Sequence, residues 1–335
     1  MPEASPDASA SDGTPDAGAS EPKPNAGASD GTQDAGASAG SDKPLGIVDL
    51  LIVVAVCAVW GVNFVVVKVG LEELHPLAFV FGRFALIAVC LAPFLRLPRG
   101  HWKQLILLSI SLGVLHFGTM FWAMDHIDAA TAAIAVQLQV PFSALLAWIF
   151  FKDRFGWRRS LGTLVAFAGV VVIAGEPRFD GGLLPLAMVI LAACIWAFTN
   201  IQVKWLGEMN VFQITGWMAI LAMPQLFVLT WILDGNPIPQ YLDASWIGWG
   251  AMLFQAVGVT VLGYGFWYGL MRRHSVNQVM PLTLLVPIFG VLSGVIFLDE
   301  HLTFPTVIGG VATLIGVAII VIRRPRLLSA RAGRV

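Results

Sequence analysis

An arginine inside an apolar run is the residue of this sequence with the clearest chemical potential. Arg83 lies about seven residues into a run that begins near residue 76, so a helix there would carry it about 10 Å below the boundary of a membrane. A cation at that depth is costly and should face the interior of a helix bundle or a wet cavity. Its planar fork suits a substrate carboxylate. The alternatives are bonds to backbone carbonyls or an outward-reaching side chain.

None of the acidic residues lies deep in an apolar run, in contrast to Arg83. Those nearest to the runs fall at or close to their ends: Asp49, Asp125, Glu176, Asp234 and Asp299. A cavity with a buried cation and no buried anion favours anions or zwitterions such as amino acids over cationic drugs.

The sequence lacks the motifs of an intramembrane enzyme. Its apolar runs contain no HExxH, no GxSxG and no pair of deep aspartates, and GxSxG occurs only within the tail over 1–44. Its three cysteines (Cys57, Cys90 and Cys194) lie inside apolar runs without the spacing of a metal site. We therefore expect no enzymatic activity, no cofactor and no metal.

Other polar and aromatic residues inside the runs are candidates for lining a substrate pathway. Unpaired amides in hydrocarbon are costly and should point inward, although many only bond neighbouring helices. Gln137 and Gln139 are two residues apart, so at most one of them contacts the ligand. The full set of predicted substrate-binding residues is Arg83, Asn63, Trp60, Gln137, Gln139, Trp196, Asn200, Tyr264 and Trp267.

Five further residues are candidates for gating, coupling or bending. Lys68 and Lys204 end equivalent runs, and each either helps to close one mouth of a pathway or anchors its helix at the interface. His116 lies in the middle of a run and is either a proton relay or a hydrogen-bonded packing residue. Pro141 and Pro287 interrupt equivalent helices and are predicted hinges.

These residues must be positioned by membrane-spanning helices. The chain has 335 residues, of which 57% are hydrophobic and only 12% charged, and its mean hydropathy is +0.78. Ten apolar runs of about 20 residues each are long enough to cross a bilayer as helices. The expected spans are 46–67, 76–95, 104–124, 129–151, 158–175, 183–203, 211–233, 246–271, 274–298 and 304–322.

The distribution of lysine and arginine predicts the orientation of these spans. If the N-terminus is cytoplasmic, nearly all lysines and arginines outside the spans fall on the cytoplasmic side, and only Lys68 and Arg178 fall outside. We therefore expect a multi-pass protein of the inner or plasma membrane with both termini in the cytoplasm. The net charge of −1 predicts no nucleic-acid partner.

The two halves of the chain repeat one another. Trp60 to Lys68 (WGVNFVVVK) matches Trp196 to Lys204 (WAFTNIQVK), and Asp153 to Gly169 runs parallel to Glu300 to Gly316 at a constant offset. Because each repeat has five spans, the second must be inverted relative to the first. The predicted organisation is a disordered acidic tail over 1–44, five-helix repeats over 45–175 and 183–322, and a basic cytoplasmic C-terminus over 323–335.

Several motifs resemble those of the EamA family in the drug/metabolite transporter superfamily. They are WGVNFVVVKVGL at 60–71, GRF at 82–84, QLQ at 137–139, GYGFW at 263–267, PLTLLVPIFG at 281–290 and FLDEHLT at 297–303. The likeness is strongest to O-acetylserine/cysteine exporters. It implies an all-α bundle of two inverted five-helix repeats that exports small metabolites. The chain departs from the family at KDRF (152–155), where a Glu is usual, and at His116, where an amide is usual.

The favoured function is secondary export of small amino-acid-like metabolites by alternating access. Within the same superfamily, a carrier of another anionic or phosphorylated metabolite, or of a nucleotide sugar, is the alternative. An intramembrane enzyme, a channel and a sensor are less favoured. The expected partners are a small zwitterionic or anionic substrate and the lipid bilayer, and the sequence leaves a homodimer open.

Overall fold

The structure is a computed structural model that describes residues 45–152, 156–175, 183–207 and 209–322. The predicted N-terminal tail (1–44) and basic C-terminus (323–335) lie outside these residues, as do Asp153, Glu176 and Arg178. Every regular element in the described part of the chain is helical.

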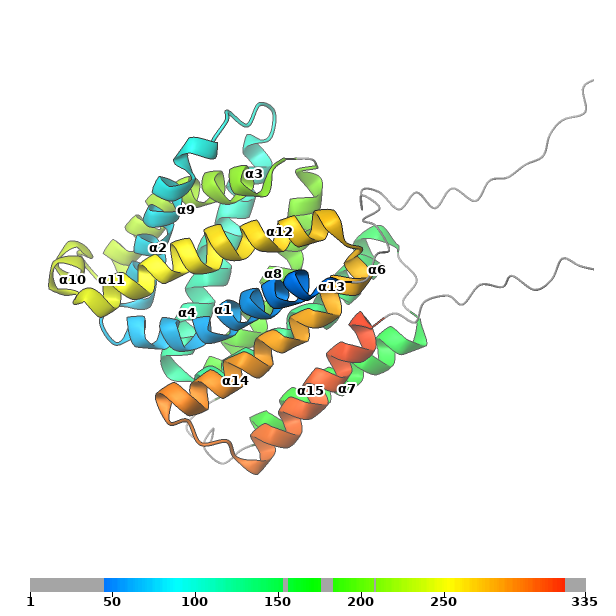
Figure 1. Ribbon diagram of the computed structural model, residues 1–335. Coiled ribbons are helices and arrows are strands. Elements are labelled where there is room, and N and C mark those ends of the chain that lie inside the picture. The colour runs from blue at the N-terminus through cyan, green and yellow to red at the C-terminus, as the bar shows by residue number, and fades with distance from the viewer. Residues whose placement is uncertain (1–44, 153–155, 176–182, 208, 323–335) are drawn as a thin grey trace, which may run out of the picture. The chain divides into compact units, whose positions relative to one another are not determined.

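The helices of the first half follow one another with short connections (Figure 1). They are α1 (Ile47–Leu71), α2 (Pro76–Leu91), the 3₁₀ turn η1 (Ala92–Phe94), α3 (Trp102–Leu108), the π-helical segment η2 (Ser109–His116), α4 (Phe117–His126), α5 (Ala129–Ala135), the 3₁₀ turn η3 (Val136–Leu138), α6 (Gln139–Phe151) and α7 (Trp157–Ala174).

The second half repeats this order, with one short additional helix, α10, between two spans. Its elements are α8 (Leu184–Trp205), α9 (Val211–Leu233), α10 (Ile238–Asp243), α11 (Trp246–Leu253), the π-helical segment η5 (Phe254–Gly263), α12 (Tyr264–Arg273), α13 (Val276–Val279), the 3₁₀ segment η6 (Met280–Leu284), α14 (Leu285–Leu298) and α15 (Phe304–Val321).

Joined across their breaks, these elements form ten helices that are long and apolar enough to cross a membrane. The prediction of ten spans is confirmed, and most of their ends agree within a few residues. The ninth span differs most, because its apolar helix runs over Met280–Leu298 and follows the separate short helix α13.

The contact between α7 and α15 shows that the two repeats are inverted. The α-carbon of Gly162 lies against Gly316 of the other helix, and Gly169 lies against Gly309, so the two helices run antiparallel. Gly162 and Gly309 are equivalent in the repeat, as are Gly169 and Gly316. Each contact therefore maps onto the other when the repeats are exchanged, as a two-fold axis in the membrane plane requires.

The other helix contacts follow the same exchange. The first span of repeat one, α1, packs along α14, and its equivalent α8 packs along α6. The second spans, α2 and α9, pack against each other, as do α7 and α15. Figure 1 shows α14 beside α1 and α15 beside α7. The predicted fold of two inverted five-helix repeats is therefore confirmed.

Equivalent spans are also broken at equivalent places. Pro141 and Pro287 each stand third in their helices, α6 and α14, directly after the 3₁₀ segments η3 and η6. Proline has no N–H to continue the helical ladder, so a break beside it costs little. The third and eighth spans carry π-helical segments, η2 and η5, which sequence analysis did not anticipate.

The bundle has two ends, and exchanging the two repeats would interchange them. The Lys68 end contains the end of α1, the α4–α5 turn and the α14–α15 loop. The Lys204 end contains the start of α1, the end of α8 and the end of α12.

The α7–α15 contact should be intolerant of even one methyl group. A Cβ at Gly169 would lie 2.4 Å from the carbonyl oxygen of Gly309, and overpacking of this kind costs about 1–3 kcal/mol. Gly169→Ala should therefore lower the melting temperature of the purified protein. Gly269→Ala in α12 is the control, because a Cβ there meets nothing within 4 Å. Equal melting temperatures for the two variants would contradict the contact.

Candidate functional site

Arg83 is buried and surrounded by aromatic rings. It extends from α2 with a side chain that is 3% exposed. Its Cζ atom lies 4.2 Å from the ring centroid of Phe117, 5.6 Å from that of Phe84 and 5.9 Å from that of Phe121. Its Nε atom has no hydrogen-bond partner. Among the ion pairs of the described residues, none involves Arg83.

No carboxylate of the described spans lies as far from a span end as Arg83 does. Asp49 is the third residue of α1 and Asp125 the penultimate residue of α4, so both stand at span ends. Asp49 contacts Arg273 at 2.9 Å and His274 at 2.8 Å, at the Lys204 end. The predicted arrangement of a buried cation without a buried anion therefore holds for the described spans.

One wall beside Arg83 is built by the end of η2 and by α8. The ring of His116 lies 4.8 Å from that of Phe117 and 5.0 Å from that of Trp196, between centroids. The Nδ1 atom of His116 is 2.8 Å from the carbonyl oxygen of Ala192, and the side chain is 4% exposed. A carbonyl can only accept, so Nδ1 carries a proton and donates it to Ala192.

A second wall brings together three predicted pathway residues. Trp60 of α1 lies 6.1 Å from Tyr264 and 5.3 Å from Trp267, between ring centroids. Gly263 makes this packing feasible, since a Cβ there would lie 2.6 Å from Nε1 of Trp60. The segment η5, which leads directly into Tyr264, packs against both α1 and α2, so the second wall lies beside the helix that carries Arg83.

The two walls are related by the repeat. Trp60 and Trp196 are equivalent, and each packs against the end of a π-helical segment in the third span of one repeat, at Gly263 and His116 respectively. The wall at His116 is the one that contacts Arg83, through the ring of Phe117. We call Arg83, His116, Trp196, Trp60, Tyr264 and Trp267 the central group.

The predicted amides divide into different environments. Asn63 accepts a hydrogen bond from Gln255 of the other repeat, and Gln255 is itself fully buried. Gln137 is buried in η3, whereas Gln139, at the start of α6, is partly exposed. Asn200 is exposed and donates to Ser143 of α6 at 3.4 Å. The structure thus does not place all four amides in the central group.

Two polar contacts were missed by sequence analysis. Ser111 of η2 donates to Gln202 of α8 at 2.6 Å, and Gln225 of α9 donates to Ser109 at 2.8 Å. Serine is common in membrane helices, so no short pattern in the sequence signals this network. These bonds tie the third span to its neighbours beside the central group.

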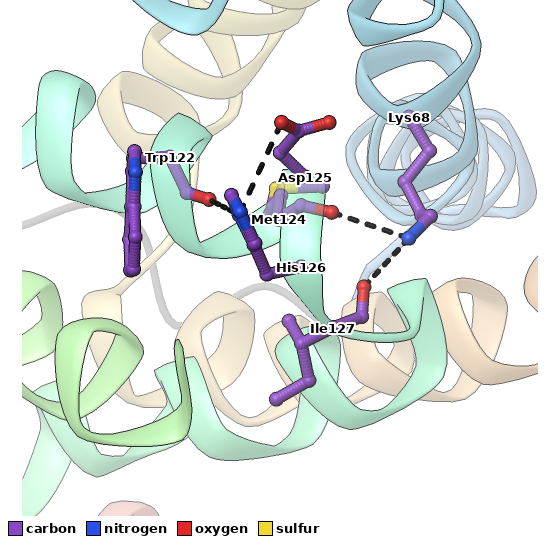
Figure 2. Close-up of polar contacts among 6 residues, drawn as sticks. All are labelled: Lys68, Trp122, Met124, Asp125, His126 and Ile127. Atoms are coloured by element: carbon purple, nitrogen blue, oxygen red, sulfur yellow. Dashed lines mark hydrogen bonds and ion pairs between the residues drawn. The ribbon is translucent and has the colours of Figure 1, made fainter. Parts of the chain in front are cut away.

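Lys68 is bound by the end of a helix (Figure 2). Its Nζ atom donates to the carbonyl oxygen of Ile127 at 2.7 Å and to that of Met124 at 3.2 Å. The same turn contains His126, whose Nδ1 lies 2.9 Å from the carbonyl oxygen of Trp122. Lys68 is therefore not simply an anchor that reaches the membrane interface.

Lys204 has a different environment, although its position in the repeat is equivalent. Its Nζ atom lies 4.0 Å from the ring centroid of Phe151 at the end of α6. The roles predicted for Lys68 and Lys204 in gating remain predictions, but the two lysines do not make equivalent contacts.

A carboxylate also binds a helix start at the Lys68 end. Glu73, in the α1–α2 connection, accepts bonds from the hydroxyl of Ser245 at 2.5 Å, from the backbone N–H of Ser245 at 2.8 Å and from that of Gly248 at 3.3 Å. These donors belong to the N-cap and the first turn of α11, in the other repeat. The bond from the Ser245 hydroxyl, with the two backbone bonds, holds the pKa of Glu73 below its usual 4.5, and burial partly opposes this.

Comparison with known proteins now identifies the family. The sequence matches the EamA-like transporter family twice, over residues 47–175 and 183–322. The chain belongs to this family. The EamA-like match covers both repeats and thus every residue of the central group.

Relatives of this EamA-like protein include two named efflux pumps. The chain is 31% identical to a probable amino-acid metabolite efflux pump of Escherichia coli (strain K12) over 82% of its own length and 93% of the relative's. Identity to the pump of the same name from Salmonella typhimurium is also 31%, over 82% and 93%. A probable terminal-alkyne amino-acid exporter of Streptantibioticus cattleyicolor is 25% identical over 78% and 89%.

A solved structure shares the fold of this EamA-like chain. One crystal structure superposes with a TM-score of 0.55 at 18% identity, covering 81% of this chain and 96% of the other. At that identity the likeness concerns the fold alone. Together with the ten spans, the family match shows that the protein is a multi-pass membrane transporter.

The contact of Glu73 predicts a pH dependence. Because the folded-state pKa of Glu73 is lowered, its contribution to stability is present at neutral pH and is lost as pH falls through that pKa. Glu73→Gln should lower the melting temperature of the detergent-solubilised protein at pH 7, and the difference from the parent should shrink as pH falls below 4.5. The exposed neighbour is the control, so Glu72→Gln should change little. A difference that grows in acid would contradict the contact.

Proposed function

We propose that the protein is a secondary exporter of small amino-acid-like metabolites, with Arg83 as the anchor for the substrate carboxylate. Arg83 is the one lysine or arginine of the described spans that lies more than one helical turn from a span end. Its burial without an ion-pair partner is the observation that carries the proposal, because a buried, uncompensated charge is strongly unfavourable. A bound carboxylate removes that cost through two parallel hydrogen bonds.

The remaining central group suits the other parts of an amino acid. The rings of Trp60, Tyr264 and Trp267 can stabilise an ammonium group through cation–π attraction, which needs no buried carboxylate. The names of the E. coli and Salmonella relatives, amino-acid metabolite efflux pumps, support the same substrate class. O-acetylserine and cysteine are the specific candidates.

The alternative substrate class is a phosphorylated metabolite or nucleotide sugar. Phosphate carries more charge than a carboxylate and would favour more than one deep cation. A single buried arginine therefore favours the carboxylate.

The proposed transport cycle alternates access between the two ends of the bundle. The excess of lysine and arginine at the Lys204 end supports a cytoplasmic location of that end and of both chain termini. The Lys68 end then faces outward. Pro141 and Pro287, beside the 3₁₀ segments η3 and η6, are the proposed bending points.

Replacement of Arg83 tests the proposal directly. Uptake of labelled cysteine and O-acetylserine into inside-out vesicles should fall at least about 30-fold in Arg83→Ala, because truncating one partner of a buried charge pair costs about 2 kcal/mol or more. Arg83→Lys should restore only part of the uptake, since it keeps the charge without the fork. The control is Arg99→Ala, a substitution at an exposed arginine outside the spans.

The same vesicles distinguish the substrate classes. Parent protein should transport the amino acids, and an excess of phosphorylated sugar should not compete. No uptake of either amino acid, with or without a pH gradient, would remove this substrate class. Undiminished uptake by Arg83→Ala would remove the carboxylate anchor.

His116 should not set the pH dependence of transport. Its Nδ1 proton is engaged by the carbonyl of Ala192 and its ring packs on Trp196, which favours the packing role over the proton relay. His116→Gln should therefore lower the rate through looser packing while the pH profile of uptake keeps its shape. A profile that becomes flat or shifts by a full pH unit would instead support a relay.

A further inference from the structure

The α4–α5 turn is held from both sides by charged residues of other elements. Lys68 of α1 donates to the carbonyl oxygens of Met124 and Ile127, at the end of α4 (Figure 2). On the other side of the turn, the carboxylate of Glu300 accepts from the backbone N–H groups of Ala129 at 2.6 Å and Ala130 at 2.8 Å. Lys68 and Glu300 thus both bind backbone groups of the same turn.

Each charge matches the helix end that it contacts. The carbonyls at a helix C-terminus carry partial negative charge and the amides at an N-terminus partial positive charge. The ammonium group meets the end of the third span, and the carboxylate meets the start of the fourth span, which continues to Phe151. No ion pair between Lys68 and Glu300 is among the ion pairs of the described residues, so their contact runs through the turn.

The α4–α5 turn is followed by the segment of the fourth span that contacts the ninth span. The helix α5 packs against α14. A Cβ at Gly290 would lie 2.6 Å from that of Ala133, and a Cβ at Gly294 would lie 2.4 Å from the carboxylate of Glu300. The two spans therefore touch without a gap at the Lys68 end.

The same two spans take different neighbours toward the Lys204 end. There the fourth span continues as α6, which packs against α8, α7 and α15. Lys204, the equivalent of Lys68, faces the ring of Phe151 rather than a helix end. The two lysines therefore differ in their contacts, as expected if only one end of the bundle is closed at a time.

We propose that Lys68 and Glu300 form a clasp that closes the Lys68 end of the pathway. The clasp fixes the α4–α5 turn, and the turn holds α5 against α14. Release of either charged residue lets α5 move away from α14 and opens this end. The clasp rests on the proposed transport function for its purpose, but its existence can be tested without any substrate.

A labelling experiment tests the clasp. The reporter is Ala133→Cys, placed at the α5–α14 contact in a background in which Cys57, Cys90 and Cys194 are replaced by alanine. A membrane-impermeant maleimide is applied to right-side-out and to inside-out vesicles. The reporter should react slowly in the intact clasp and at least about 10-fold faster after Lys68→Met or Glu300→Gln. Lys68→Arg, which keeps the donor and its charge, should stay slow.

A backbone variant removes one bond without changing any charge. Ala129 is the first residue of α5, and Asp128 before it is extended (φ −62°, ψ 145°), which is compatible with a following proline. Ala129→Pro deletes the N–H that Glu300 accepts and should speed labelling. Ala129→Val adds similar bulk but keeps the N–H, so it should label more slowly than Ala129→Pro.

Exchange of the charges separates the clasp from a simple ion-pair gate. In Lys68→Glu/Glu300→Lys, an ion pair would be restored, whereas each charge of a helix-end clasp would face the wrong helix end. We expect the exchanged variant to label as fast as the single variants or faster. Slow labelling in the exchanged variant would overturn the clasp, as would unchanged labelling in Lys68→Met and Glu300→Gln.

A second reporter guards against unfolding. Leu105→Cys lies buried in α3, at the start of the third span and thus toward the Lys204 end, and should stay unlabelled in every variant. Fast labelling at position 105 together with position 133 would mean that the variant has unfolded and would count against the clasp. The vesicle type that gives fast labelling at position 133 also reports which side the Lys68 end faces. A clasp that behaves as expected without amino-acid uptake would contradict only the proposed function.

Discussion

Hydrocarbon offers the peptide backbone no hydrogen-bond partner, and this constraint shapes every part of the bundle. It forces the apolar runs to form helices of 18–28 residues. Where a helix stops or breaks, the freed groups must be satisfied within the protein. Prolines occupy positions beside the 3₁₀ segments, where a missing N–H costs least. At the Lys68 end, Lys68 binds free carbonyls, and Glu73 and Glu300 bind free amides. These charged residues therefore lie at helix ends, where backbone groups have no partner within the helix.

Arg83 is an exception, because it is a charged residue away from any helix end. Comparing the free energy of its cation–π contacts with the cost of its desolvation explains why it indicates a ligand. Cation–π contacts with its surrounding rings contribute about 0.5–2 kcal/mol each. Removing a guanidinium from water costs several kcal/mol even after the protein relaxes. The distance from Cζ of Arg83 to the ring centroid of Phe117 is the shortest of its three ring contacts. Because two of the three ring contacts are near the limit of this attraction, we expect the rings to offset only part of the cost and a bound anion to offset the rest. The same imbalance favours a zwitterion over a cation.

The sequence predicts the spans and their inversion because both follow from patterns of many residues. Length and apolar content define a span, and Trp60, Trp196 and the paired glycines mark the repeat. The depth of Arg83 follows in the same way. The pairing of Asn63 with Gln255 does not, because the residues lie in different repeats and no local pattern joins them. The partners of Lys68 are hidden for another reason: it binds backbone carbonyls, and every residue type supplies one. The π-helical segments arise from tertiary packing and leave no short motif.

A closure made from helix-end contacts has an appropriate strength for a transporter. A charge at a helix end contributes about 0.3–2 kcal/mol, so Lys68 and Glu300 together amount to a few kcal/mol. Reversing a two-state equilibrium from 1:99 to 99:1 requires about 5.5 kcal/mol of differential binding. Ligands with dissociation constants between about 1 mM and 1 μM bind with about 4–8 kcal/mol. A metabolite that gains most of its affinity at Arg83 in one conformation can therefore overcome the clasp. A fully buried ion pair at the same place would risk holding the end shut, whereas bonds to a movable turn can be broken and remade in each cycle.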